Sequence, residues 1–242
     1  MGDRLFSARR LPGRLVRFPL RLIPRGTIVP ILGGPARGLK WIVGSGPHSC
    51  WMGLNEIRKQ RVFANHVMPG AVVYDIGANV GIYTLIAARR AGPSGQVVAF
   101  EPLPDNVRYL QRHVHLNNLR HVRVEQSAAW REGGLVRFVG TPDRVRSHVR
   151  ESGDLEVRAV SIDGLLATGD LRPPTCLKID VEGSEVQVLE GARATVQAHH
   201  PVIFLATHGP DFDTDCRAIL GEQGYAVRTI PGHPDELIAQ AR

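Results

Sequence analysis

The stretch LKIDVEGSE, residues 177–185, brings one lysine and three carboxylates to the end of a short apolar run. Because strand side chains alternate, Lys178, Asp180 and Glu182 are expected to share one face of this strand. Carboxylates beside an ammonium can orient a hydroxyl group and accept its proton. The chain has 27 arginines and three lysines, so a lysine at position 178 indicates a need for a compact ammonium there.

Structural roles explain part of the same pattern. Glu182 can cap the helix that follows, and Glu185 can be an ordinary first-turn acid, since acids are favoured at a helix start. Lys178 can form an ion pair with Asp180 that ends the strand. For Asp180 the catalytic interpretation is favoured, because a buried unpaired charge is costly and marks functional sites.

The segment PVIFLATH, residues 201–208, is predicted to be a strand that ends at the same sheet edge. We therefore expect His208 to meet Lys178 and Asp180 around the reacting group, with Glu182 shaping the pocket. Asp180 and His208 are alternative general bases, since an unperturbed imidazole titrates near neutral pH. The stretch lacks the [DN]PP[YFW] motif that grips a planar amine, so the predicted acceptor atom is a hydroxyl oxygen.

A glycine loop precedes this stretch in the chain. YDIGANVG, residues 74–81, reads as a turn from strand to helix, in which Gly77 and Gly81 permit close backbone approach. Glu101 ends the next predicted strand, where an acid can accept both hydroxyls of a ribose. Asp75, ahead of the glycines, disfavours a pyrophosphate and favours a ligand with a positive centre. The pattern therefore predicts S-adenosylmethionine rather than NAD as the cofactor.

Strand-like and helical patterns alternate between residues 54 and 230, which predicts an α/β fold with a parallel sheet covered on both faces. Strands are expected at 71–77, 96–101, 122–128, 135–140, 155–162, 175–181, 201–208 and 225–230, and helices at 54–67, 82–91, 105–118, 185–200 and 216–223.

Three segments, VVYDIGANVGIYTLIAA, AFEPLPDNVRYLQRHVHLN and CLKIDVEGSEVQVLEGA, resemble the successive motifs of FkbM-type methyltransferases. The resemblance covers roughly residues 70–210 and implies a doubly wound, mostly parallel seven-strand Rossmann-like methyltransferase sheet. It also implies which residues hold S-adenosylmethionine: Asp75, Gly77, Asn79 and Gly81 at the methionine part, Glu101 at the ribose, and Asn106, Ser127 and Ala128 near the adenine. Many members carry an acid where this chain reads FLATHG, so that role is absent here or moved to His208.

Charge is concentrated at the N-terminus. Residues 1–49 carry nine Lys and Arg and one acid, whereas the rest of the chain carries 21 basic and 22 acidic residues. We therefore expect a basic arm at 1–49, a methyltransferase domain at 50–242, and no nucleic-acid partner. Arginines at helical spacing indicate weak contact of residues 1–25 with an anionic membrane surface. Pro12, Gly13 and Pro19 interrupt this pattern, which favours a disordered arm or a helix packed on the domain.

Cysteine and histidine usage predicts neither a disulfide framework nor a metal site. Cys50, Cys176 and Cys216 are far apart and form no CxxC pair. His113 and His115 point to different faces of a helix, and most of the ten histidines read as surface residues. No apolar run approaches the ~18 residues of a membrane helix. The expected location is the cytoplasm, at most peripheral to a membrane.

The predicted activity is the transfer of a methyl group from S-adenosylmethionine to a hydroxyl of a small molecule or sugar. One alternative is an NAD-dependent oxidoreductase, although its GxGxxG loop is missing. Another is a non-catalytic nucleoside-binding module that binds a partner through the basic arm.

Overall fold

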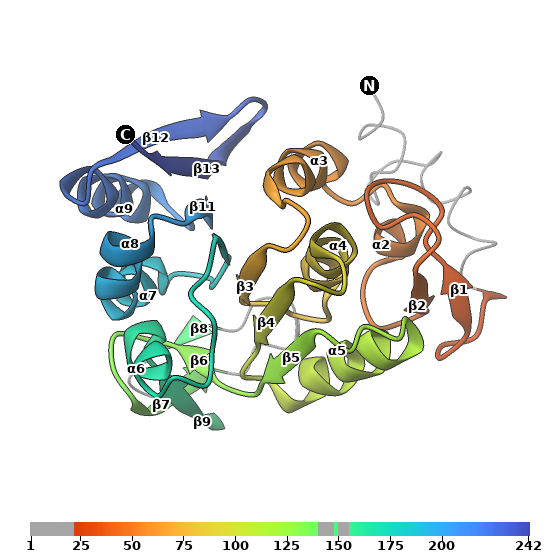
Figure 1. Ribbon diagram of the computed structural model, residues 1–242. Helices are drawn as coiled ribbons and strands as arrows, with labels where there is room; N and C mark the ends of the chain where they lie inside the picture. Colours follow the sequence, from red (N-terminus) through yellow and green to blue (C-terminus); the bar gives the residue numbers. More distant parts are fainter. Residues whose placement is uncertain (1–21, 140–147, 150–154) are drawn as a thin grey trace.

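The computed structural model describes residues 22–139, 148–149 and 155–242 and has a central sheet with helices on both faces (Figure 1). The strands of this sheet are β3 (Val72–Ile76), β4 (Gln96–Phe100), β5 (Val122–Glu125), β10 (Cys176–Ile179), β11 (Val202–Ala206), β12 (Tyr225–Ile230) and β13 (His233–Ala241). Among the described residues these seven lie in the order β12-β13-β11-β10-β3-β4-β5. The pairs from β11 to β5 are parallel, and β13 is antiparallel to both its neighbours. The predicted seven-strand, mostly parallel sheet is confirmed.

Two hydrophobic clusters fill the two faces of the sheet. The helices are α2 (His48–Met52), α3 (Ile57–His66), α4 (Ile82–Ala91), α5 (Pro104–Leu116), α6 (Ile162–Ala167), α7 (Glu185–Gly191), α8 (Arg193–His199) and α9 (Pro210–Glu222). Val73 and Val97 pack on the side of α3 and α4, whereas Tyr74 and Val98 pack on the side of α7, α8 and α9. Because both faces are covered, β3 is buried along its whole length.

A second, smaller sheet follows β5. It comprises β6 (Ala128–Ala129), β7 (Gly134–Val139), β8 (His148–Val149) and β9 (Leu155–Val160), in the order β6-β9-β7-β8. β7 and β9 pair in antiparallel fashion, with Val136 opposite Val157. These are the two extended segments that the sequence predicts between the second and third motifs.

The N-terminal segment does not stay apart from the domain. β1 (Ile28–Pro30) and β2 (Lys40–Ile42) form an antiparallel hairpin, and Trp41 is fully buried in the same cluster as α3 and α4. The division at residue 49 into arm and domain therefore does not hold for this hairpin, because its apolar side chains belong to the domain core. Residues 1–21, which carry most of the predicted amphipathic pattern, lie outside the described residues.

His113 is a buried anchor for this hairpin rather than a surface histidine. Its Nε2 accepts a hydrogen bond from the Ile42 amide at 3.1 Å, its Nδ1 donates to the Val80 carbonyl at 2.8 Å, and its ring stacks on Trp41. Burial lowers the pKa of His113 to about 4, so the ring stays neutral. The ring thus ties the hairpin to the glycine loop.

Candidate active site

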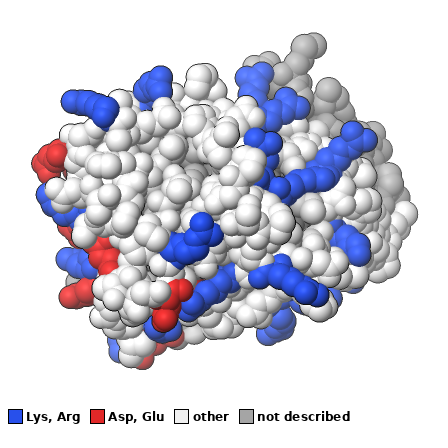
Figure 2. All heavy atoms as spheres, in the orientation of Figure 1, with Lys and Arg blue, Asp and Glu red and all other residues white. Residues whose placement is uncertain are grey.

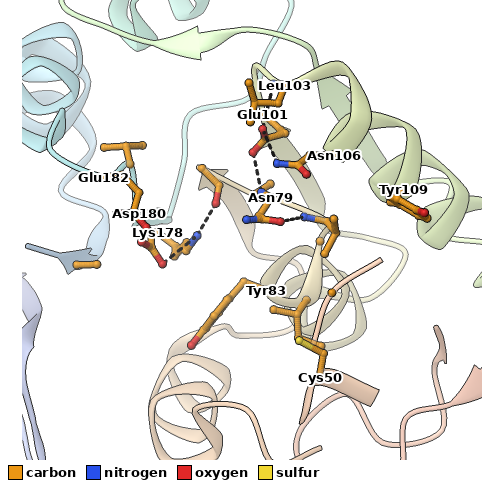
Figure 3. A pocket seen from close by; sticks show the side chains of 18 of the residues that line it. Cys50, Asn79, Tyr83, Glu101, Leu103, Asn106, Tyr109, Lys178, Asp180 and Glu182 are labelled. Atoms are coloured by element: carbon orange, nitrogen blue, oxygen red, sulfur yellow. Dashed lines mark hydrogen bonds and ion pairs between the residues drawn. The ribbon is translucent and has the colours of Figure 1, made fainter. Parts of the chain in front are cut away.

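A cavity of about 1850 Å³ lies beyond the carboxyl ends of β3, β4, β10 and β11. β3 and β10 are neighbours in the sheet, although β4 follows β3 in the chain, so the strand order reverses direction between them. Ligands of open α/β sheets bind at such a switch point. Figure 3 shows the two sides of the cavity, with Asn79, Glu101 and Asn106 on one side and Asp180 and Glu182 on the other.

The glycine loop needs its glycines for close approach of protein backbone. Gly77 has φ 74°, and a Cβ built there would lie 1.9 Å from the Asp180 carbonyl oxygen. Gly81 has φ 101°, and its Cβ would lie 2.4 Å from Cδ1 of Leu110 in α5. The two glycines therefore let the loop pack against β10 and α5, and both line the cavity.

Glu101 is tied to the protein by three hydrogen bonds. Its Oε2 accepts from the Asn79 amide at 2.8 Å, and its Oε1 accepts from the Leu103 amide at 3.0 Å and from Nδ2 of Asn106 at 3.1 Å (Figure 3). Burial raises the pKa of this carboxyl, and the three hydrogen bonds oppose the rise. The carboxylate is therefore held in a fixed orientation at the edge of the cavity, next to the glycine loop.

Ser127 and Ala128 line the same part of the cavity. The Ser127 hydroxyl is buried and has no hydrogen-bond partner within the described residues. A buried hydroxyl without a partner costs free energy unless a ligand or water satisfies it. This side of the cavity therefore offers an unused hydrogen-bonding group where the resemblance expects an adenine.

Asp75 does not line the cavity, contrary to the expectation that it faces a positively charged ligand. It is fully buried, and its Oδ2 accepts a 2.6 Å hydrogen bond from the Thr84 hydroxyl. Its Oδ1 lies 3.1 Å from Nζ of Lys178, which also donates to the Gly77 carbonyl at 2.9 Å. The positive centre beside Asp75 is thus the lysine of the neighbouring strand, and Lys178 is fixed in place beneath the cavity.

The structure brings Lys178, Asp180 and His208 together, as the sequence predicts. Asp180 Oδ2 lies 3.8 Å from Nζ of Lys178, and Asp180 Oδ1 lies 3.7 Å from Nε2 of His208. Glu182 Oε2 lies 3.6 Å from Nε2 of His208. Since β10 ends at Ile179 and Glu182 has φ 43°, Glu182 reaches the cavity through a turn rather than by strand alternation.

Glu185 is more than a first-turn acid of α7. It is fully buried, and its Oε1 lies 2.5 Å from Nδ1 of His208 and accepts a 3.0 Å hydrogen bond from the Gly183 amide. Burial opposes the charge on His208, but the bond to Glu185 and the charges of Asp180 and Glu182 raise its pKa. His208 is therefore favoured as an imidazolium, which is a proton donor.

Two further charged residues reach the cavity from elements where the sequence showed no candidate. Nζ of Lys59 in α3 contacts Oε1 of Glu236 in β13, and lies 3.5 Å from Asp180 Oδ2 and 3.9 Å from Glu56 Oε2. The Tyr83 ring lies beside Nζ of Lys59 at 5.5 Å from its centroid. Lys59 is 5% exposed and Glu236 also lies inward, with a side chain 16% exposed.

These contacts give the carboxyl groups different proton affinities. Burial opposes ionisation of Asp180, but Lys178 and Lys59 lower its pKa below the usual value. Burial raises the pKa of Glu236 to about 7, because Lys59 only partly offsets the burial and the charges of Asp180 and Glu56 add to it. Asp180 is therefore a stable anion, whereas Glu236 changes its protonation near neutral pH.

The rarity of lysine in this chain could have identified Lys59 as a site residue from the sequence. Lys59 is one of the three lysines, and the reasoning that selected Lys178 applies to it equally. Glu236 gave no such signal, since it lies in the polar start of an unpredicted strand.

Among the described residues, no group of three or more His, Cys, Asp or Glu side chains is arranged to hold a metal ion. The three cysteines are free and buried.

The sequence profile of the methyltransferase FkbM domain matches residues 75–227, which include the glycine loop, Glu101 and the LKIDVEGSE stretch. The chain belongs to this family. Members of the family are S-adenosylmethionine-dependent methyltransferases, and the cofactor of this enzyme is S-adenosylmethionine. The predictions of family and cofactor are confirmed.

Relatives and solved structures agree with this assignment. The chain is 28% identical over 169 residues to the hexuronic acid methyltransferase AglP of Haloferax volcanii, covering 68% of this chain and 67% of AglP. It is 26% identical over 225 residues to the 31-O-demethyl-FK506 methyltransferase FkbM of Streptomyces tacrolimicus, covering 76% and 81%. The fold matches the methyltransferase FkbM from Methylobacillus flagellatus KT with a TM-score of 0.51 at 17% identity, over 81% of this chain and 55% of that longer chain.

Proposed function

We propose that this methyltransferase transfers the methyl group to a hydroxyl oxygen of a small molecule or sugar. The observation that carries the proposal is the charged cluster opposite the glycine loop, in which Asp180, Glu236 and Lys59 converge on the cavity. Carboxylates accept hydrogen bonds from hydroxyl groups, and a carboxylate with a raised pKa is a competent proton acceptor. The names of the two relatives, a hexuronic acid methyltransferase and a 31-O-demethyl-FK506 methyltransferase, support this substrate class.

The glycine-loop side fits the cofactor. Glu101 would accept the ribose hydroxyls with the lone pairs that its backbone partners leave free, and the unpartnered Ser127 hydroxyl would meet the adenine. The loop from Gly77 to Gly81 would lie against the methionine part. When bound, S-adenosylmethionine supplies an electrophilic methyl on a sulfonium.

Glu236 is the general base of this proposal. Asp180 is held as an anion by two lysines, which weakens it as a proton acceptor, and His208 is favoured in its protonated form. Glu236 has a pKa of about 7, which suits a base that works near neutral pH. S-adenosylmethionine would supply the methyl group to the acceptor oxygen, and Glu236 would take up the proton that this oxygen loses.

Lys59 and Lys178 would keep this arrangement in place. Lys178 fixes the end of β10 against the glycine loop, through the Gly77 carbonyl and Asp75. Lys59 holds Glu236 and Asp180 on the same side of the cavity. Such positioning supplies much of the rate enhancement of an in-line displacement, since the reacting atoms start in the right geometry.

The first experiment is a methyl-transfer assay with isotopically labelled S-adenosylmethionine and a panel of uronic acids, glycosides and macrocyclic alcohols. We expect labelled ether products from at least one hydroxyl class. Calorimetry should show S-adenosylhomocysteine binding on the order of −8 kcal/mol, with NAD much weaker. Labelling of amines instead of hydroxyls would contradict the acceptor class, and tight cofactor binding with no turnover on any acceptor would favour a non-catalytic module.

A further inference from the structure

The molecule has a basic half and an acidic half. Residues 22–123 carry twelve Lys and Arg and four Asp and Glu, whereas residues 124–242 carry twelve and eighteen. Two of the four acids in the first half, Asp75 and Glu101, are buried, so its surface is more basic than the count indicates. In Figure 2, Lys and Arg lie over the whole visible face, whereas Asp and Glu gather toward the left edge and the bottom, so the right-hand half shows Lys and Arg alone.

A groove of about 640 Å³ lies within the basic half, between the loop after β1, helix α3 and the end of α4. It shares no lining residue with the active-site cavity. Its charged lining residues are all arginines: Arg37, Arg61, Arg89 and Arg90. We call this surface the arginine groove.

Two of the four arginines hold the groove together, and the other two are free to bind a ligand. Arg89 donates to the carbonyls of Pro35 and Arg37, and Nε of Arg90 donates to the Ala64 carbonyl at 2.8 Å. Their guanidinium groups therefore tie the loop and α3 to α4. In the described part of the chain, the guanidinium groups of Arg37 and Arg61 have no carboxylate partner.

Two exposed leucines lie in the loops at this end of the molecule, one in the groove and one next to it in the neighbouring loop. Leu32 lines the groove and is 56% exposed, and Leu54 is 41% exposed. The two belong to neighbouring loops, since the Leu32 amide donates to the Trp51 carbonyl at 2.8 Å and Gly33 packs on Gly53. Large apolar side chains beside unpaired arginines are typical of a surface that meets both acyl chains and lipid phosphates.

We propose that the arginine groove docks on an anionic phospholipid membrane, with Arg37 and Arg61 on the lipid phosphates and Leu32 and Leu54 in the interfacial layer. Guanidinium groups bind phosphate oxygens in bidentate fashion, which suits Arg37 and Arg61 to this task. Nucleic acid would use the same cations but would leave the two leucines facing water, so the apolar rim favours the lipid surface.

The test is co-sedimentation of the full chain with vesicles of phosphatidylcholine alone or mixed equally with phosphatidylglycerol. We expect binding to the mixed vesicles that weakens as salt is raised. Arg37→Glu/Arg61→Glu should lower the partition coefficient by about tenfold or more, because each basic residue at the surface contributes appreciably. Leu32→Ser/Leu54→Ser should also lower the partition coefficient, and by a factor that depends less on salt concentration than the factor for the arginine variant.

The matched control is Arg158→Glu/Arg193→Glu, which makes the same change in net charge at exposed positions in the acidic half. It should leave vesicle binding within about twofold, and all variants should keep S-adenosylhomocysteine affinity, which shows that they are folded. If the control lost vesicle binding equally, net charge rather than the arginine groove would explain the binding, and the proposal would be wrong. If only an Arg10→Glu/Arg14→Glu variant lost vesicle binding, the membrane contact would lie in the N-terminal residues and not in the arginine groove.

Two competition arms separate other ligands from the membrane. Inorganic phosphate at millimolar concentration should not displace the protein from the vesicles, and complete displacement would indicate a simple anion site. An unrelated RNA duplex should bind the wild type and the Leu32→Ser/Leu54→Ser variant equally weakly. RNA binding that is stronger than vesicle binding and is lost in Arg37→Glu/Arg61→Glu would overturn the proposal.

Discussion

The two walls of the active-site cavity use their charged groups in different ways. On the glycine-loop wall, Glu101 accepts hydrogen bonds from two backbone amides and from Asn106, so the loop fixes the orientation of its carboxylate. On the opposite wall, Lys59 is shared by Asp180, Glu236 and Glu56, which leaves negative charge in excess of the ammonium.

The first wall is therefore suited to holding the cofactor, and the second wall to proton transfer. A carboxylate satisfied by backbone donors keeps one orientation, which suits the binding of a cofactor that is the same in every turnover. A crowded carboxylate with a raised pKa can take up and release a proton, which suits the chemical step. Substitutions on the first wall should therefore affect folding and cofactor affinity, and those on the second should affect rate and pH dependence.

Gly77→Ala should cause the largest loss of stability, because its Cβ would meet the Asp180 carbonyl oxygen at 1.9 Å. We expect the free energy of unfolding in urea to fall by about 4 kcal/mol, since backbone on both sides must move. Gly92→Ala is the control, with a positive φ but nothing within 4 Å of the added Cβ. It should cost only about 1 kcal/mol. Equal losses would show that strain, rather than contact with β10, fixes the loop.

Lys59→Met should destabilise the second wall in a pH-dependent way. Without the ammonium, the folded-state pKa of Glu236 rises further above its unfolded value, so the folded protein binds more protons and loses stability as pH rises. We expect a loss of about 3 kcal/mol near pH 8 and a smaller loss near pH 6. Lys40→Met, on the hairpin surface, should be nearly neutral at both. A loss that does not depend on pH would contradict the shared-charge description of this wall.

Glu101→Gln keeps the shape of the side chain and replaces one acceptor oxygen with a donor. We expect the affinity for S-adenosylhomocysteine to fall by about tenfold, or about 1.4 kcal/mol, because a ribose hydroxyl loses its acceptor. Calorimetry measures this directly, and Glu222→Gln on α9 is the distant control. An unchanged affinity would remove Glu101 from the cofactor site.

His208→Ala should have the smallest effect on the reaction. Since His208 pairs with Glu185 and is favoured in the protonated form, it orients the wall rather than accepting the proton. We expect kcat to fall by less than about tenfold. A loss of about a hundredfold or more would return the role of base to His208.

Sequence reasoning found the half of the site that lies on parallel strands. The apolar runs of β3 and β10 are short and bounded, and each ends in a charged motif, so the sequence predicts the strand ends and the site residues together. In the sheet β10 lies beside β3, and this pairing brings the two charged motifs to the same cavity.

The other half of the site lies on elements whose own sequence does not predict a strand or a site. The segment His233–Ala241 begins with His, Pro, Asp and Glu and becomes apolar only afterwards, so its sequence does not predict a strand. Its pairing with β11 nevertheless brings Glu236 to the cavity. The hairpin strands β1 and β2 have three residues each and are held by tertiary packing. The expected helix at 185–200 is two helices that meet at Ala192, where Gly191 packs against the Trp130 carbonyl.

The pH dependence of kcat/KM for wild type and Glu236→Gln tests the central claim most directly. With the acceptor found in the labelling screen, the wild-type rate should rise about tenfold per pH unit below the Glu236 pKa of about 7 and level off above it. Glu236→Gln should be slower by about 10²–10⁴ and lack this inflection, with S-adenosylhomocysteine affinity unchanged. A Glu236→Gln enzyme that keeps the inflection and most of its rate would contradict the assignment of Glu236 as the base.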